Sequence, residues 1–129
     1  MKKRLLTITM LCISLLLTAQ TVSVADFGLQ PNTFEDATEF VQKALAECQK
    51  KKDVTLVFPK GRYDFWPDKA KKHEFYISNT SSETDCESKI KNIGIFLDKH
   101  KDLTIEGNGS QFVFHGKMIT WGINNSQNI

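Results

Sequence analysis

Short extended segments separated by equally short turns dominate the hydrophobic pattern over much of the chain. Within residues 93–97, 103–105 and 112–114, apolar residues alternate with polar or small ones, which is the period of a half-buried strand. Further strands are expected at residues 21–27, 54–58, 62–65, 75–78 and 118–123. Strands this short make weak hairpins, but coils of two or three strands stacked on one another pair every backbone group. The pattern therefore predicts a mainly β fold built of stacked coils, from which residues 66–91 make an excursion.

One amphipathic helix is expected between the first two strands. Either Asn32 or Thr33 can cap it, because each is followed three residues later by an acid, as in a capping box. Apolar residues then recur at steps of three and four, namely Phe34, Ala37, Val41, Leu45 and Cys48. Such a helix must lie on an apolar surface.

The end of the chain repeats an earlier motif. The run Lys101, Asp102, Leu103 is echoed by residues 127–129, Gln-Asn-Ile, about one coil later. A repeat architecture needs several units to bury its core, and here the second unit stops at its first inward residue. We expect a truncated solenoid whose last coil exposes unpaired backbone groups and apolar residues such as Phe112 and Phe114, which makes isolated material prone to aggregate.

The first twenty residues have the layout of a secretory signal. Lys2, Lys3 and Arg4 precede an apolar run over residues 5–17, and small or polar residues follow. That run is too short to span a bilayer comfortably. We expect a signal peptide at 1–20, cleaved near Ala19 or Gln20, and a mature domain at 21–129 exported to the periplasm or the medium.

Two cysteines remain after the signal, since Cys12 lies inside its apolar run. A disulfide between Cys48 and Cys86 is permissible in an oxidising space and would stabilise the fold by about 4 kcal/mol. The alternative is that Cys48, on the apolar face of the expected helix, is an inert buried thiol.

Composition excludes some classes of function. The 129 residues are 40% hydrophobic and 25% charged, which is typical of a globular domain, and the net charge of +2 is too small to predict nucleic-acid binding. The lysines form local clusters with no base-reading motif beside them, so we interpret them as solvated turns and helix ends.

Two stretches resemble a known module. "VSVADFG" at 22–28 and "VTLVFPKGRYDF" at 54–65 resemble the entry module of secreted β-helix polysaccharidases, including polygalacturonase-like and pectate-lyase-like proteins. This resemblance implies a right-handed parallel β-helix in which a strand and a helix cap the open N-terminal end and shield the first coil.

Two further stretches are more specific, "YDFWPDKAKKHEFYISN" at 63–79 and "LTIEGNGSQFVFHGKM" at 103–118. Together they resemble the N-terminal part of glycoside hydrolase family 110, the exported bacterial α-1,3-galactosidases. The resemblance implies hydrolysis of terminal α-1,3-linked galactose from glycans. It also implies that the acidic catalytic groups belong to later coils, so no catalytic residue is assigned here and the chain by itself is expected to be inactive.

Carboxylates are candidates for chemistry, because inverting hydrolysis needs two of them about 6.5–9.5 Å apart. The available pairs are Asp64 with Asp68 and Asp98 with Asp102. Both are interpreted as turn-forming or solvated aspartates. Glu106 is expected to point outward beside inward Ile105, a single carboxylate on the face where a β-helix places its binding groove.

The other candidate side chains favour structural roles. The histidines His73, His100 and His115 lack metal-ligand spacing, so no metal or cofactor is expected. Either Trp66 or Trp121 could stack on a sugar, but burial in the excursion or between coils is the favoured interpretation. The run Gly107, Asn108, Gly109 is interpreted as a tight corner requiring positive φ, because no helix follows to make it a phosphate loop.

Two alternatives to an α-galactosidase stay open. One is a non-catalytic carbohydrate-binding β-helix module, which aromatic ladders on later coils would favour. The other is a polygalacturonase-like hydrolase, which basic residues beside paired aspartates would favour, since its substrate is anionic. The sequence leaves the oligomeric state open.

Overall fold

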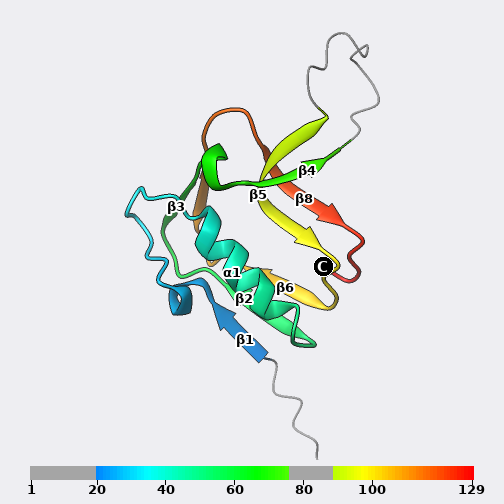
Figure 1. Cartoon of the computed structure of the whole chain (residues 1–129). Helices are drawn as coiled ribbons and strands as arrows, with labels where there is room; N and C mark the ends of the chain where they lie inside the picture. The colour runs from blue at the N-terminus through cyan, green and yellow to red at the C-terminus, as the bar shows by residue number, and fades with distance from the viewer. Residues whose placement is uncertain (1–19, 76–88) are drawn as a thin grey trace, which may run out of the picture.

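The computed structural model describes residues 20–75 and 89–129, which leaves nearly all of the predicted signal segment outside (Figure 1). The described chain is mainly β, as predicted. Its strands are β1 (Gln20–Ser23), β2 (Val54–Val57), β3 (Arg62–Phe65), β4 (Lys71–Glu74), β5 (Ile90–Asp98), β6 (Leu103–Glu106), β7 (Gln111–Phe114) and β8 (Ile119–Asn124). The helices are α1 (Thr38–Cys48) and the 3₁₀ segments η1 (Val24–Phe27) and η2 (Pro67–Lys69).

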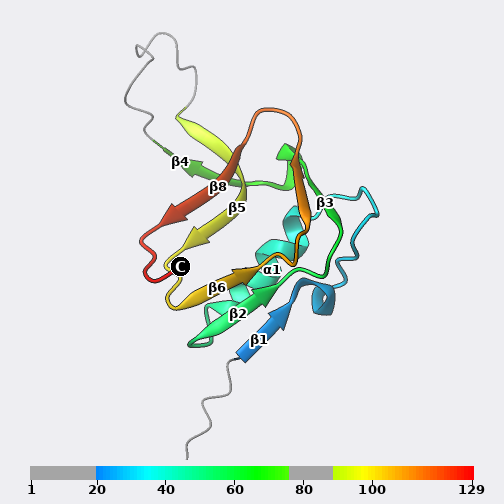
Figure 2. The ribbon, with the colours of Figure 1, turned by 180° about the vertical axis from the view of Figure 1, so that it is seen from behind.

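Three small sheets are formed, and all but one of their strand pairs are parallel. The strand orders are β1-β2-β6, β3-β7 and β4-β5-β8, and the exception is the antiparallel pair β4–β5. Figure 2 shows β1, β2 and β6 lying side by side. Strand β2 thus pairs with β6, β3 with β7 and β5 with β8, so two successive sets of three strands pair in the same order along the chain.

The core lies where the inner faces of these sheets meet. In-register partners place Val54 beside Leu103 and Tyr63 beside Phe112. The ring of Phe58 packs edge-on against Tyr63 and Phe112, with ring centroids 5.4 and 4.9 Å apart, a favourable aromatic geometry. The buried residues form one contiguous cluster, which also includes the inner face of α1.

Short polar residues make the corners between strands. Asp53, Asp102 and Asn128 all adopt positive φ, at 49°, 52° and 53°, a conformation that Asp and Asn tolerate better than other non-glycine residues. The side-chain amide of Asn128 donates to Asp102 Oδ1 (2.8 Å), and Asn124 donates likewise to Asp98 Oδ1 (2.9 Å), each across 26 residues. The predicted echo between residues 101–103 and 127–129 is therefore confirmed, and each corner is bonded to the next.

The helix begins later than predicted. Its first residue is Thr38, whose N–H donates to Asp36 Oδ1 (3.0 Å). Backbone pairing with β3 competes with helix formation before that point, since Ala37 N donates to the carbonyl of Asp64 (2.8 Å). The prediction that Phe34 faces the core was wrong, because it lies in this paired segment at φ 61° and is 62% exposed.

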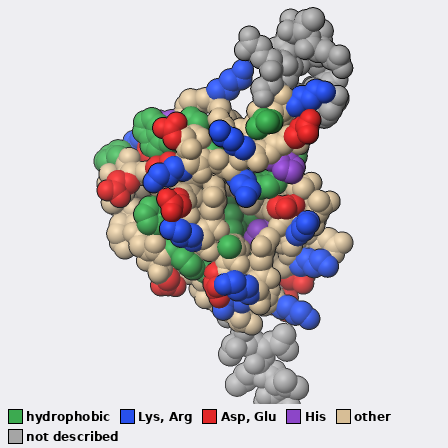
Figure 3. All heavy atoms as spheres, viewed as in Figure 1, with side chains coloured by type: hydrophobic (Ala, Val, Ile, Leu, Met, Phe, Trp, Pro, Cys, Tyr) green, Lys and Arg blue, Asp and Glu red, His purple; other side chains and the backbone are tan. Residues whose placement is uncertain are grey.

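The remaining apolar positions of the helix are buried as predicted, namely Ala37, Val41, Leu45 and Cys48. Through this face α1 packs against η1, β1, β2 and β5. On its outer face, acidic and basic side chains are interspersed (Figure 3), and Lys43 pairs with Glu39 at 2.8 Å.

Two strand predictions need correction. The expected strand at 21–27 ends at Ser23 and becomes η1, because Ser23 and Asp26 form a capping box that stabilises a helical turn. Strand β4 was not predicted, since its sequence is mostly charged, and it forms by pairing with the edge of β5. The strand expected at 75–78 falls, beyond Phe75, outside the described residues.

Cys48 is a free, buried thiol, in agreement with the alternative to a disulfide. Burial raises the pKa of the Cys48 thiol to about 11, so it stays protonated and unreactive at neutral pH. The other member of the predicted disulfide, Cys86, lies outside the described residues.

Replacing Leu56 by Ala should lower the free energy of unfolding by about 2–5 kcal/mol, because Leu56 is fully buried between Val22 and Ile105 and the loss of its side chain leaves a cavity in the core. Urea unfolding measures this. The matched control is Thr55→Ala on the outer face of the same strand, for which a change within about 0.5 kcal/mol is expected. Equal losses in both variants would contradict the assigned inner and outer faces.

Candidate functional site

A buried carboxylate on β3 is the centre of the most chemically distinctive cluster in the described chain. Tyr63 and Phe65 point to the core, so Asp64 between them points to the other face, yet it is only 2% exposed. It is covered because residues 32–37 run alongside β3, with a parallel bridge between Asp36 and Asp64.

Three nitrogen atoms surround the Asp64 carboxylate. Arg62 Nε donates to Oδ2 (2.9 Å) and Arg62 Nη2 to Oδ1 (2.7 Å), while His115 Nε2 lies 2.7 Å from Oδ1. The hydrogen bonds from Arg62 lower the pKa of Asp64; burial opposes this, and His115 adds to the lowering. Asp64 is therefore ionised at neutral pH with its lone pairs engaged, so it is unsuited to act as a general acid.

Two exposed aromatic rings flank this ion pair. The indole of Trp66 stacks on the imidazole of His115, with ring centroids 3.8 Å apart and planes 5° from parallel. The ring of Phe34 lies over the guanidinium of Arg62, whose Cζ is 4.6 Å from the ring centroid. We call these five residues, Phe34, Arg62, Asp64, Trp66 and His115, the Asp64 cluster.

Three members of the cluster, Asp64, Trp66 and His115, were separate site candidates in the sequence, and nothing in the sequence predicted that they lie together. Asp64, Trp66 and His115 meet because β3 pairs with β7, and just past the paired residues His115 N donates to the carbonyl of Phe65 (2.9 Å). The bond between Arg62 and Asp64 could have been anticipated, since residues two apart on a strand share a face. No pattern in the sequence indicated that Phe34 belongs there.

The carboxylate pairs proposed from sequence do not form an open acid and base. Asp64 was predicted to be a turn-forming or solvated aspartate, and this was wrong, because it is a buried ion-pair partner. Asp68 lies exposed in η2. Asp98 and Asp102 accept the corner amides described above, which confirms their turn role. Glu106 is exposed, as predicted, and accepts a hydrogen bond from the backbone of Asn108 (2.9 Å).

The Gly107–Gly109 corner is confirmed as a turn, but positive φ falls on Asn108 and Gly109 and not on Gly107. The two tryptophans were expected to be buried, and this was wrong. Trp66 is 41% exposed at the edge of the Asp64 cluster, and Trp121 is 38% exposed, with its ring 6.0 Å from that of Phe112.

The other two histidines lie apart from the cluster. His73 packs against the rings of Phe75 and Phe96, with centroids 4.8 and 4.9 Å away. His100 is buried with Nε2 3.1 Å from the carbonyl of Leu45. Over residues 20–75 and 89–129, no three His, Cys, Asp or Glu side chains gather as metal ligands, and no helix is long and apolar enough to cross a membrane.

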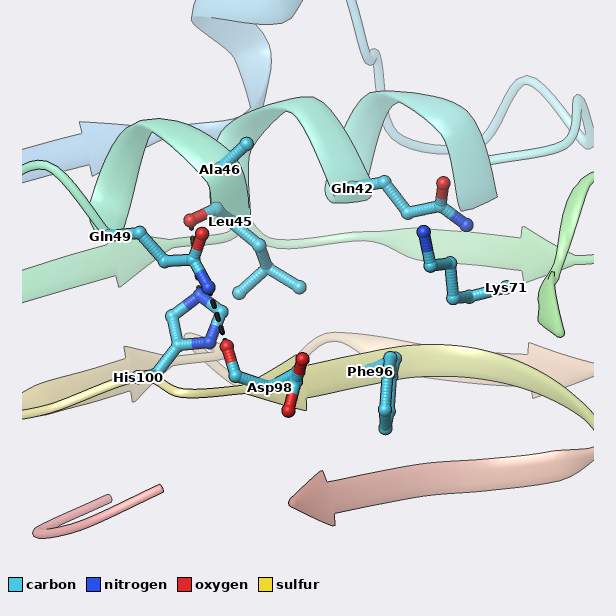
Figure 4. Close-up of a pocket in the computed structure, with 8 residues that line it drawn as sticks. All are labelled: Gln42, Leu45, Ala46, Gln49, Lys71, Phe96, Asp98 and His100. Carbon is cyan, nitrogen blue, oxygen red and sulfur yellow. Dashed lines mark hydrogen bonds between the residues drawn. The ribbon is translucent and has the colours of Figure 1, made fainter. Parts of the chain in front are cut away.

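A cavity of about 310 Å³ lies between α1 and β5 (Figure 4). Gln42, Gln49 and Lys71 reach into it from α1 and β4, and His100 and Asp98 line the opposite wall. Gln49 Nε2 donates to the backbone carbonyl of Asp98, beyond the point at which β4 stops pairing with β5. The polar groups of this cavity thus serve partly to satisfy an exposed strand edge.

Replacing Asp64 by Asn should destabilise the protein by about 1–2 kcal/mol at pH 7, because two charge-assisted hydrogen bonds weaken while water screens the partly exposed Arg62. The lowered pKa of Asp64 gives a stability that is present above its ordinary value of 3.8 and is lost as the pH falls through its value in the folded protein. The deficit should therefore shrink in denaturant unfolding at pH 3. Asp68→Asn is the control and should match the parent at both pH values; a deficit for Asp64→Asn that is unchanged at pH 3 would disprove the ion-pair origin.

Comparison with known proteins identifies relatives for most of the chain, although no protein-family model matches it. An α-1,3-galactosidase A of Bacteroides fragilis is 48% identical over 100 residues, covering 78% of this chain and 16% of that protein. An α-1,3-galactosidase B of Bacteroides thetaiotaomicron is 40% identical over 129 residues, covering 100% of this chain and 20% of that protein. An α-1,3-galactosidase A of Shewanella woodyi is 46% identical over 112 residues, covering 86% of this chain and 17% of that protein.

The aligned residues include both stretches on which the resemblance to glycoside hydrolase family 110 was based, since one alignment spans the whole chain. The chain spans about a sixth to a fifth of the length of the curated relatives it matches. Over that span, this chain is a glycoside hydrolase family 110-like region, similar in sequence to proteins named α-1,3-galactosidase A and B.

Proposed function

We propose that the chain is the first part of an exported glycoside hydrolase that removes terminal α-1,3-linked galactose from glycans. The observation that carries this proposal is the 40–48% identity to proteins named α-1,3-galactosidase over most of the chain. Only a small share of those relatives is aligned, so the proposal concerns the role of this region within such an enzyme.

We infer further that residues 21–129 form the capped beginning of a right-handed parallel β-helix. Support comes from the ordered parallel matching of β2, β3, β5 with β6, β7, β8, and from the bonded Asp and Asn corners between them. The backbone continues this matching beyond β8, where Leu103 N donates to the carbonyl of Asn128 (3.1 Å). Helix α1 lies against β1, β2 and β5, as a cap on the first coil would.

The opposite end of the stack is apolar. Phe112 and Phe114 are only partly buried, and Trp121 and Ile123 are exposed at 38% and 57%. In a β-helix these inward positions would receive the next coil, which would also pair the free edges of β6, β7 and β8. We infer that the chain alone keeps this end open and is prone to associate through it.

We also infer that the chain alone does not hydrolyse glycosides. Hydrolysis needs a protonated and an ionised carboxyl group across the sugar. Among the described carboxylates, Asp64 is locked by Arg62 and His115, and Asp98 and Asp102 bond the amides of the following corner. An acid and base pair would then come from later coils of a longer protein.

A non-catalytic carbohydrate-binding module is the second candidate. The specific observation in its favour is the pair of exposed aromatic side chains, Phe34 and Trp66, beside polar groups in the Asp64 cluster. Turnover by a longer reading frame distinguishes the two candidates, because a pure binding module would show none.

The purified chain should show no release of p-nitrophenol from p-nitrophenyl α-galactoside and no galactose from an α-1,3-galactosyl disaccharide. A longer protein that carries this region together with the remainder of such a hydrolase should release galactose from the disaccharide. Turnover by the 129-residue chain would refute its proposed inactivity. A folded longer protein that binds but never cleaves the disaccharide would favour the binding module.

Export should be visible as processing of the amino terminus. When the chain is produced in a Gram-negative host, we expect its mature form in the periplasm or medium with an N-terminus close to Thr21, because a basic, apolar and small-residue order precedes that point. Mass spectrometry of fractionated cells measures this. Replacing Leu15 and Leu16 by Asp should retain the uncut chain in the cytoplasm, and a parent chain found uncut in the cytoplasm would contradict export.

A further inference from the structure

We propose that the Asp64 cluster is a binding surface for a neutral hexopyranose, with galactose-terminated glycans as the ligand class. The choice of galactose rests on the proposed function, whereas the site itself rests on the geometry of Phe34, Arg62, Asp64, Trp66 and His115.

The cluster contains the two kinds of group that a sugar ring contacts, exposed aromatic rings and polar side chains. A pyranose presents patches of C–H bonds that pack on aromatic planes, and hydroxyl groups at its rim that need hydrogen-bonding partners. Here Phe34 and Trp66 are 62% and 41% exposed, and the contacts Phe34–Arg62, Arg62–Asp64, Asp64–His115 and His115–Trp66 join them through polar groups.

The polar groups are held in place by the buried carboxylate. Arg62 uses Nε and Nη2 on Asp64, and His115 uses Nε2, while the Asp64 side chain is 1% exposed. Among the described residues, Arg62 Nη1 and His115 Nδ1 have no protein partner, and their side chains are 34% and 26% exposed. These two nitrogen atoms are therefore available to sugar hydroxyls on side chains that are already ordered, which lowers the entropic cost of binding.

Phe34 supplies an observation that packing does not explain. A phenylalanine at φ 61° is in a strained backbone conformation, and such strain recurs at ligand-binding sites. Its ring gains no burial in return, because it lies in solvent over Arg62. The Trp66–His115 stack at the other end of the cluster can be explained by structure alone, because it continues the β3–β7 pairing. The same explanation gives Phe34 no role.

The charge of the cluster selects the class of sugar. The guanidinium of Arg62 is already neutralised by Asp64 at 2.7 Å, so a uronic acid or a phosphate would find no uncompensated positive charge there. A polygalacturonase-like substrate is therefore disfavoured, and a neutral hexose with several hydroxyl groups fits better.

The test is a titration of the purified chain with methyl α-galactopyranoside, followed by heteronuclear NMR and by tryptophan fluorescence. We use a Trp121→Phe background for fluorescence, so that Trp66 is the reporter. Saturable shifts of the Trp66 indole and of the Arg62 and His115 side chains are expected. Trp66→Ala and Phe34→Ala should each weaken binding about tenfold. Trp121→Ala, which removes a similarly exposed ring elsewhere, should leave the affinity unchanged.

Circular dichroism first establishes that each variant is folded. If Trp66→Ala does not fold, Phe34→Ala alone tests the site, because the Phe34 ring makes no core contact. Galacturonic acid should bind at least about tenfold more weakly than the neutral galactoside. Preferential binding of the acid, equal losses in Trp121→Ala and Trp66→Ala, or no saturable binding by the folded parent would each overturn the proposal. None of these results bears on hydrolysis by the longer protein, so failure of the surface and failure of the proposed function are separately visible.

Discussion

In-register stacking of inward side chains is the interaction on which the other features of this structure depend. Val54 lies beside Leu103, Tyr63 beside Phe112 and Ile95 beside Trp121, and each pair requires its two strands to be parallel and unshifted. A slip by one residue would turn every inward side chain to the opposite face. The bonded corner of Asp102 and Asn128 opposes such a slip, since its amide reaches only the equivalent residue of the preceding corner.

The same register creates the Asp64 cluster. Because Tyr63 and Phe65 are buried in the core, Asp64 between them faces outward. The pairing of β3 with β7 then brings His115 against Trp66. The segment before α1 then pairs with β3 and covers the carboxylate, which gives up helical turns at residues 34–37. Burying a carboxylate is costly unless it is fully bonded, and Arg62 and His115 meet that requirement.

The similarity to known proteins concerns only a small share of their length. Identity to α-1,3-galactosidases extends over most of the chain, but the chain covers only about a sixth to a fifth of those proteins. Of the carboxylates considered as candidates, Asp64 is held in an ion pair, and Asp98 and Asp102 accept the amides of the following corner, whereas Asp68 is exposed. The exposed carboxylate of Glu106 accepts a hydrogen bond from the backbone of its own turn.

Local pattern alone determined the mainly β character and the strands at 62–65 and 103–105. It also determined the buried face of α1 from Ala37 onward and the repeated corner at Asp102 and Asn128. Each of these features depends on periodicity or on a conformation that few residues tolerate. Tertiary contacts decided the rest. Pairing with β3 delayed the helix and exposed Phe34, the free edge of β5 recruited charged β4, and the β3–β7 register joined Asp64, Trp66 and His115. These outcomes depend on partners far away along the chain, and a local pattern holds no information about which distant strand will supply the neighbour.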